Sequence, residues 1–288
     1  AEEQIKKSLN IKFKLHGNHH LSTSISFNSL GLLYQNKGHY NQALEYYEKA
    51  LMIKLKVHGD QHPSTGISYN SLGAVWSAKG EYEKAIEYYE KSLGILLKVY
   101  GDHHRSTGIA YNSLGQVWNK LGEYEKAIKF YEKTLKINLK IHGDQHPYTG
   151  IVYNNLGLAW NNKKEFDRGI ENYKKALAIL IIYYGKNHSR TSVAYGNIGE
   201  TFNNMGNYEK AFEMLDKSLV IKLKTHGKNH PSVGVGYLKL GDVWKNKGDK
   251  NNAEKVYKKA LTIFKEKLGK KHDRTLLVEK KLKELNEK

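Results

Sequence analysis

The chain has 288 residues, of which 39% are hydrophobic, and its 47 Lys and Arg against 29 Asp and Glu give it a net charge of +18. It has no cysteine, which excludes disulfides, a thiolate zinc site and a catalytic thiol. It has only three prolines, which favours helices over loop-rich β-sandwiches. The longest apolar run, residues 177–184, is too short to span a bilayer, and the acidic start of the chain is unlike a signal peptide. We therefore expect a cytoplasmic location and no membrane segment.

A period of 42 residues runs through the chain. Within each period an aromatic residue is followed by Leu or Ile, by Gly and by a second large aromatic residue, as in Tyr69, Leu72, Gly73 and Trp76. These four positions share one face of a helix with about 3.6 residues per turn. Each period ends at a glycine that keeps the same register: Gly17, Gly59, Gly101, Gly143, Gly185, Gly227 and Gly269.

The spacing predicts fourteen helices, which we take in chain order. Residues 1–16 correspond to the second helix of a repeat. Six antiparallel helix pairs then occupy residues 21–58, 63–100, 105–142, 147–184, 189–226 and 231–268. A charged helix at 272–287 closes the array as a cap, with Leu276, Leu277, Leu282 and Leu285 expected to face inward. A single helix pair cannot bury its own apolar stripe, so the pairs must stack, and we expect one solenoid over residues 1–288.

Some repeats depart from the pattern. Lys163 and Lys164 stand where other repeats have the helix-ending glycine, and Gly169 replaces the usual alanine. Leu215 and Lys250 each replace a tyrosine. We expect weaker packing at these places without a change of fold.

The pattern from Tyr69 to Trp76, followed by Ala85 and Tyr89, resembles the tetratricopeptide repeat (TPR). The 42-residue period and the inter-repeat sequence Gly-Asp-Gln-His-Pro at 59–63 are similar to kinesin light chain. The resemblance implies an all-α fold, a right-handed α-solenoid (TPR superhelix) of stacked antiparallel helix pairs. It also implies a scaffold or adaptor for protein–protein interaction that binds an extended peptide or partner segment in a concave groove. We do not expect this protein to be an enzyme. The heptad coiled coil through which a kinesin light chain joins its motor is missing from this sequence, so we do not predict attachment to a motor.

Asparagine recurs on the face of the first helices that lies opposite the inward residues. It is a mediocre helix former, and its amide can both donate to and accept from the main chain of a peptide. Lysines on the same face can bind a carboxylate, and Leu32, Ile67 and Leu158 offer small apolar pockets. The predicted peptide-binding residues of the groove are Asn28, Asn70, Asn112, Asn154, Asn155, Asn197, Asn119, Asn161, Asn203, Lys120, Lys239 and Lys245. The alternative is that the asparagines are solvated or form ladders between neighbouring repeats.

The charge leaves other functions open. The last 45 residues hold 15 Lys and Arg against 7 Asp and Glu, so an acidic protein or peptide would be attracted there. A basic solenoid that binds nucleic acid is the alternative function, although no nucleic-acid-binding motif is present. A regulatory or cargo-binding arm of a larger motor or enzyme assembly is a further alternative. Self-association through the N-terminal half repeat is also compatible with the sequence.

Histidine pairs recur around the inter-repeat glycines, for example His58 and His62. The helix ends between the two residues, so we expect the second histidine to precede or cap the next helix, and we expect no metal site. No catalytic constellation or phosphate-binding loop is present, and we expect no cofactor.

Overall fold

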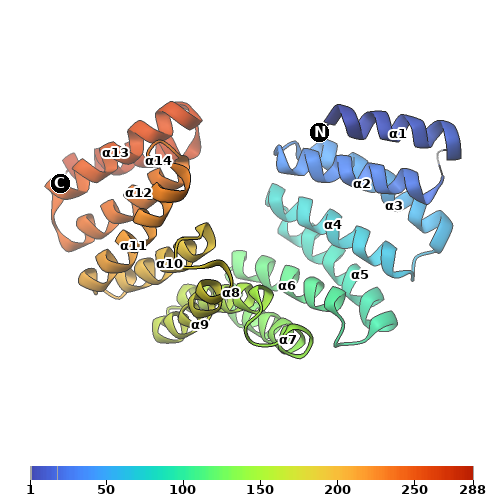
Figure 1. Cartoon of the computed structure of the whole chain (residues 1–288), viewed down its shortest axis with the longest axis horizontal. Coiled ribbons are helices and arrows are strands. Elements are labelled where there is room, and N and C mark those ends of the chain that lie inside the picture. Colours follow the sequence, from blue (N-terminus) through green and yellow to red (C-terminus); the bar gives the residue numbers. More distant parts are fainter. Residues whose placement is uncertain (1, 18, 288) are drawn as a thin grey trace. The chain divides into compact units, whose positions relative to one another are not determined.

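The computed structural model describes residues 2–17 and 19–287. In these residues it contains fourteen α-helices and no strand (Figure 1). The helices are α1 (Glu2–His16), α2 (Leu21–Asn36), α3 (Tyr40–His58), α4 (Pro63–Lys79), α5 (Tyr82–Tyr100), α6 (Arg105–Lys120), α7 (Tyr124–His142), α8 (Pro147–Asn162), α9 (Phe166–Tyr184), α10 (Ser189–Asn204), α11 (Tyr208–His226), α12 (Pro231–Lys247), α13 (Lys250–Leu268) and α14 (Asp273–Asn286).

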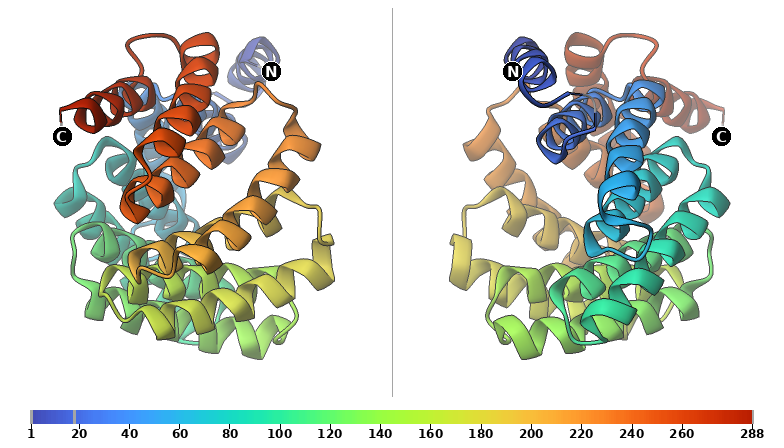
Figure 2. Two further views of the ribbon diagram at one scale, coloured as in Figure 1. Left: turned by 90° about the vertical axis from the view of Figure 1, so that its left-hand side faces the viewer. Right: turned by 90° about the vertical axis from the view of Figure 1, so that its right-hand side faces the viewer.

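The helices pack as antiparallel pairs, which confirms the predicted all-α architecture. Helix α2 packs on α3, α4 on α5, α8 on α9, α10 on α11 and α12 on α13. The second helix of one pair also packs on the first helix of the next, as α3 does on α4 and α11 on α12. The chain divides into two compact units, Ala1–Ile141 and His142–Lys288, and each is a stack of such pairs (Figures 1 and 2).

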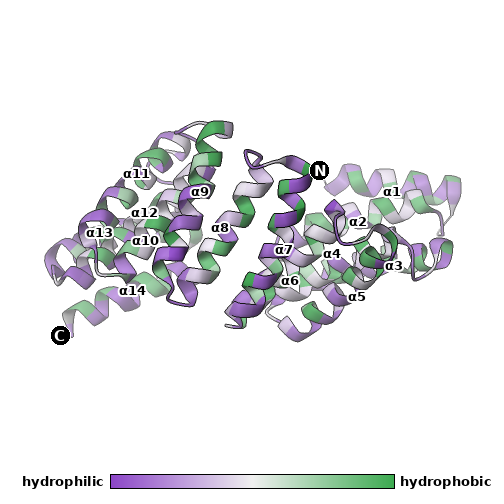
Figure 3. Cartoon of the chain, turned by 90° about the horizontal axis from the view of Figure 1, so that it is seen from below, coloured by the Kyte–Doolittle hydropathy of each residue, from purple (hydrophilic) through white to green (hydrophobic). Residues whose placement is uncertain are grey.

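Burial follows the predicted apolar face of each helix. Leu72 in α4 and Leu114 in α6 are fully buried, and Ala85 in α5 is buried at the contact between the helices of a pair. Both hydrophobic and hydrophilic residues are visible on the same helices in Figure 3, which is the amphipathic pattern that stacking requires.

A histidine is the N-cap residue immediately before each first helix from α2 to α14. The imidazole Nδ1 of His62 accepts a hydrogen bond from the backbone N–H of Ser64 at 3.1 Å, and six other first helices are capped in the same way. The side chain therefore satisfies one of the backbone N–H groups that a helix N-terminus leaves without a partner. This confirms the capping role expected for the second histidine.

Shortly after the end of each first helix from α2 to α12, one residue adopts the left-handed backbone conformation, with positive φ. Gly80 has φ of 84°, and equivalent glycines follow α2, α6, α10 and α12. After α8 the same conformation is taken by Lys164, with φ of 69°, which is the one non-glycine residue with positive φ among the described residues. A residue with a Cβ is strained in this region, so the departure noted in the sequence has a local energetic cost.

The inward face of α14 differs from the prediction. Val278 and Leu285 are buried, whereas Leu276 and Leu277 are 49% and 44% exposed. Positions 275, 278, 282 and 285 lie on one helical face because successive members are three or four residues apart, about one turn of helix, and this face packs on α13. The assignment of Leu276 and Leu277 to the inward side was therefore wrong.

Candidate peptide-binding face

The first helices α2, α4, α6, α8 and α10 each expose an aliphatic side chain at the same position of the repeat. In the first unit these residues are Ile25, Ile67 and Ile109, which are 59%, 48% and 48% exposed. In the second unit Ile151 and Val193 are exposed at the equivalent positions. We call the side of the first helices that carries these residues the first-helix face of each unit. Of this row the sequence analysis singled out only Ile67, although the 42-residue recurrence of Ile or Val would have revealed the rest.

The asparagines lie beside this aliphatic row, towards the neighbouring repeat. Asn28 and Asn70 are half-buried, and their Oδ1 atoms are buried with no hydrogen-bond partner within the described residues. Asn161 at the end of α8 has an Oδ1 atom of the same kind. A buried amide oxygen without a donor costs about 1–3 kcal/mol. Because these oxygens are buried within the fold, a ligand would meet the part of each side chain that reaches solvent and not the oxygen itself.

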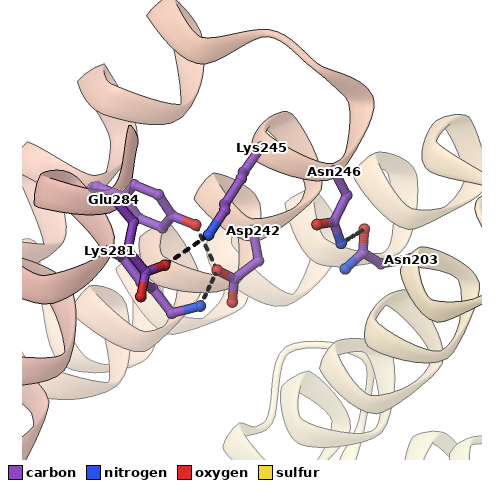
Figure 4. Close-up of polar contacts among 7 residues, drawn as sticks. Asn203, Asp242, Lys245, Asn246, Lys281 and Glu284 are labelled. Atoms are coloured by element: carbon purple, nitrogen blue, oxygen red, sulfur yellow. Dashed lines mark hydrogen bonds and ion pairs between the residues drawn. The ribbon is translucent and has the colours of Figure 1, made fainter. Parts of the chain in front are cut away.

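In the second unit two pairs of asparagines join neighbouring first helices. Asn197 Nδ2 donates to Asn154 Oδ1 at 2.9 Å, and Asn246 Nδ2 donates to Asn203 Oδ1 at 3.2 Å (Figure 4). Both pairs are 43 residues apart, one residue more than the repeat. These four amides thus form the inter-repeat ladder that was considered as an alternative to peptide contact.

The other predicted asparagines are also on first helices. Asn112 and Asn119 in α6 and Asn155 in α8 are half-buried, and each already has an interaction partner. The structure therefore places Asn154, Asn197 and Asn203 between neighbouring repeats, while Asn112, Asn119 and Asn155 are half-buried residues of α6 and α8 with part of each side chain in solvent.

The three predicted lysines bind groups within the chain. Lys120 Nζ lies 3.4 Å from Ser77 Oγ, Lys239 Nζ is 2.7 Å from Glu200 Oε2, and Lys245 Nζ is 3.0 Å from Glu284 Oε2 (Figure 4). The hydrogen bond from Lys245 lowers the pKa of Glu284. The two ion pairs join residues 39 apart and tie α10 to α12 and α12 to α14.

A third ion pair of this spacing holds α14. Lys281 Nζ donates to Asp242 Oδ1 at 2.7 Å, and the hydroxyl of Tyr257 donates to the same oxygen at 2.6 Å. Burial, together with the hydrogen bond to Asp242, raises the pKa of Tyr257 well above its usual value. The carboxylate of Asp242 thus connects α12, α13 and α14.

Two cavities open among these residues in the second unit. One of about 760 Å³ lies where α8, α10 and α12 end, and its lining includes Asn161, Asn203 and Asn246 together with Phe166 and Tyr208. A smaller one of about 240 Å³ is lined by Lys239, Lys245, Lys281, Glu200, Asp242 and Asn203, among others. The structure therefore gathers Asn161 with Asn203, and Asn203 with both predicted lysines of this unit.

The histidine pairs at the inter-repeat loops stack their rings, and the second histidine of each pair caps a helix. The rings of His58 and His62 stack with centroids 4.0 Å apart, while His62 caps α4. Within the described ranges, no three His, Cys, Asp or Glu side chains gather in a way that would hold a metal ion. None of the helices described combines the length and the apolarity needed to cross a membrane.

The amino-acid sequence matches the model of a known repeat family. The tetratricopeptide repeat model matches residues 1–56, 40–98, 77–138, 106–160, 161–219 and 190–266. No curated protein matches the chain in sequence.

Solved structures share the fold. BtubC (BKLC) from P. vanneervenii has a TM-score of 0.64 at 21% identity, over 81% of this chain and 91% of that one. A Podosopora anserina protein whose name refers to a kinesin light chain and nearly identical TPR-like repeats has a TM-score of 0.62 at 23% identity, over 72% of this chain and 98% of that one. A Rap protein complexed with Competence and Sporulation Factor has a TM-score of 0.68 at 15% identity, over 99% of this chain and 80% of that one. The chain therefore belongs to the tetratricopeptide repeat family, and its relatives in fold include kinesin-light-chain-like repeats.

Proposed function

We propose that this chain is a non-enzymatic scaffold that binds an extended segment of a partner protein along its first-helix face. Family membership supports the general role, because tetratricopeptide repeat proteins are interaction scaffolds that bind protein or peptide partners. The observation that carries the proposal is the registered row of exposed aliphatic residues, with Ile25 and Ile67 beside the half-buried side chains of Asn28 and Asn70.

This combination suits an extended peptide. A peptide in extended conformation presents backbone N–H and C=O groups at regular intervals, and the amides of the half-buried asparagines can bond to them where part of the side chain reaches solvent. Its side chains can bury the aliphatic row, at about 25 cal/mol for each Å² of apolar surface removed from water. Neighbouring helices are about 10 Å apart, so every third residue of such a peptide, at ~3.3 Å per residue, would meet the next aliphatic side chain.

The two units offer different chemistry to a ligand. Beside the aliphatic row, the first unit carries Leu32, Ala74 and Gln116 at one position of the repeat. The equivalent positions in α10 and α12 are Glu200 and Asp242, both in ion pairs. We therefore expect the first unit to bind an uncharged segment and the second unit to bind a charged one.

The test is selection of random peptides of about 12 residues, long enough to cross three or four first helices. In Ile67→Glu/Ile109→Glu, the selected peptides should bind at least tenfold more weakly, because each buried aliphatic contact contributes ~1.5–3 kcal/mol. Val57→Glu/Val99→Glu is the matched control, because these residues are 47% and 46% exposed but lie on second helices. Equal loss in both variants would show that the peptides bind elsewhere.

The amides are tested separately. In Asn70→Ala/Asn112→Ala/Asn154→Ala we expect weaker binding of every selected peptide, since the contact is to the main chain and not to a particular side chain. Glu90→Ala/Glu132→Ala, on the exposed side of α5 and α7, serves as the control. Undiminished binding by the asparagine variant would remove these amides from the site.

A further inference from the structure

The loops between repeats change charge along the chain. In the loops after α3, α5 and α7, the residue directly after the helix-ending glycine is an aspartate, namely Asp60, Asp102 and Asp144. In the loops after α9, α11 and α13 a lysine stands there instead, namely Lys186, Lys228 and Lys270. The glycine before this residue has positive φ in all six loops, so the turn is the same and does not account for the change from acid to base.

The three loops with lysine form one edge of the second unit. They lie at the same end of the stacked pairs, because α9, α11 and α13 end there and α10, α12 and α14 begin there. We call residues 182–190, 224–232 and 265–274 the basic loop edge, and they contain nine Lys and Arg against two Asp and Glu.

Most of this positive charge has no partner within the chain. Lys265 pairs with Glu279 and Lys267 pairs with Glu266. The other seven cations of the basic loop edge form no ion pair among the described residues. The edge therefore attracts an anion that carries several charges.

A cavity of about 610 Å³ opens at this edge. Lys228, Lys267, His226 and His230 line it, and its lining contains no Asp or Glu from the part of the chain that the structure describes. The rings of His226 and His230 stack with centroids 4.5 Å apart, and Nδ1 of His230 accepts from the backbone N–H of Ser232 at 3.1 Å. The two rings are thus fixed at the positive end of α12, between the two lysines that line the cavity.

An exposed aromatic ring lies on the same edge, at the end of α9. Tyr183 is 58% exposed, and its ring meets that of Tyr184 edge to face with centroids 4.8 Å apart. Tyr184 is held in turn by His188, which stacks on it at 4.5 Å, and by Arg190, which donates to its hydroxyl at 2.8 Å. A ring that is exposed and held in place in this way is suited to stacking with a base.

We propose that the basic loop edge binds single-stranded nucleic acid, with phosphates at the lysines of successive loops and a base stacked on Tyr183. This goes beyond the proposed scaffold function and does not rest on it, because these residues lie in the inter-repeat loops and at helix ends and not on the first-helix face. It gives a location to the nucleic-acid alternative that the charge of the sequence left open.

Charge and spacing both favour this occupant. Packed helices are about 10 Å apart, so the lysines recur along the edge of the stack at regular intervals. A nucleic acid carries one negative charge on every nucleotide and can meet several of these lysines at once. A duplex keeps its bases stacked on one another, whereas a single strand can offer a base to Tyr183.

The experiment measures binding of a fluorescein-labelled oligothymidylate of about 20 nucleotides to the full chain, by fluorescence anisotropy over a series of salt concentrations. In Lys186→Gln/Lys228→Gln/Lys270→Gln, the slope of log K against log salt should fall in magnitude by about 2, because each phosphate contact with a single strand contributes ~0.7. The matched control is Lys164→Gln/Lys210→Gln/Lys250→Gln, which removes the same charge from exposed lysines at the opposite ends of α9, α11 and α13. Its slope should stay close to that of the parent chain.

The base contact is tested at Tyr183. Tyr183→Ala should weaken binding about tenfold without changing the salt slope, because it removes a stacking contact and no charge. Tyr183→Phe keeps the ring and should bind as the parent does. A duplex of the same length should bind the parent chain more weakly than the single strand.

Several results would overturn the proposal. They are absence of oligonucleotide binding even at about 50 mM salt, equal losses in the two triple-lysine variants, and unchanged binding by Tyr183→Ala. Phosphatidylserine vesicles are the second probe. If they bind the parent chain but not the Lys186/Lys228/Lys270 variant, while Tyr183→Ala leaves oligonucleotide binding intact, the edge is a membrane-binding surface and the assignment to nucleic acid is wrong.

Discussion

The ring of Tyr131 in α7 lies so close to Gly115 in α6 that a methyl group on the glycine would be 2.7 Å from ring atom Cε1. The same contact joins Gly73 to Tyr89 and Gly157 to Tyr173. The glycine of the repeat is therefore required by the tyrosine that packs on it, and the two helices of a pair approach each other through this contact.

Gly115→Ala is expected to lower the free energy of unfolding by about 1–3 kcal/mol, because the buried ring must move. The control is Gly94→Ala in the middle of α5, where an added Cβ meets nothing within 4 Å. That change should raise stability by roughly 0.5–1 kcal/mol through helix propensity. Urea denaturation followed by circular dichroism measures both, and a stabilising Gly115→Ala would contradict the packing described.

Lys164→Gly should raise the free energy of unfolding by about 1 kcal/mol, because glycine adopts the observed φ of 69° without the strain that a Cβ causes. Lys163→Gly is the neighbouring control. Lys163 has φ of −71°, which any residue adopts, so glycine brings no gain there. A thermal melt of both variants compares them directly, and a gain from Lys163→Gly alone would reverse the assignment of strain.

His62→Ala should cost about 1 kcal/mol, because the backbone N–H of Ser64 loses the imidazole acceptor. His62→Asn should recover most of this loss, since asparagine is among the best N-cap residues. Amide hydrogen exchange in the first turn of α4 locates the effect. If alanine and asparagine behave alike, the ring acts by stacking on His58 and not as a cap.

The amide pair Asn154 and Asn197 is testable by a double-mutant cycle with alanine. We expect a coupling energy of about 0.5–1.5 kcal/mol, because each single change leaves the other amide without its partner. Additive effects would mean that the hydrogen bond contributes nothing to the contact between α8 and α10, which would leave both amides available to a ligand.

Lys222→Met is expected to stabilise the protein at neutral pH by up to about 3 kcal/mol. The pKa of Lys222 is about 8 in the folded chain and ~10.4 in the unfolded one. Below pH 8 the side chain is charged in both states, so the folded state bears the whole free-energy cost of desolvating the ammonium group. Between these two values the unfolded chain binds more protons, and the stability of the parent chain rises with pH.

The advantage of the methionine variant should therefore shrink as the pH is raised from about 8 to 10. Denaturant unfolding at pH 7, 8.5 and 10 measures the trend. Lys54→Met provides the comparison, because there the substitution also removes two hydrogen bonds to Ser68 and Ser64 and the gain should be smaller. A difference that is independent of pH would show that Lys222 does not titrate in this range.

The helices and their pairing could be predicted from the amino-acid order because the determinants are local. The register of Gly73 and Trp76 with Tyr89 lies within one repeat, and the glycines and histidines at the helix ends act on the next few residues. Contacts of this kind recur every 42 residues, so a repeat in sequence is a repeat in structure.

The partners of the polar side chains could not be predicted in this way, because they belong to different repeats. That Asn154 bonds Asn197 depends on a one-residue offset between parallel helices, and the pairing of Lys239 with Glu200 depends on a spacing of 39 residues. That Lys54 donates to Ser68 likewise depends on packing, because a hydroxyl 14 residues away approaches the ammonium only when neighbouring helices are packed together. Tertiary packing therefore decided which of these amides and charges have partners within the chain.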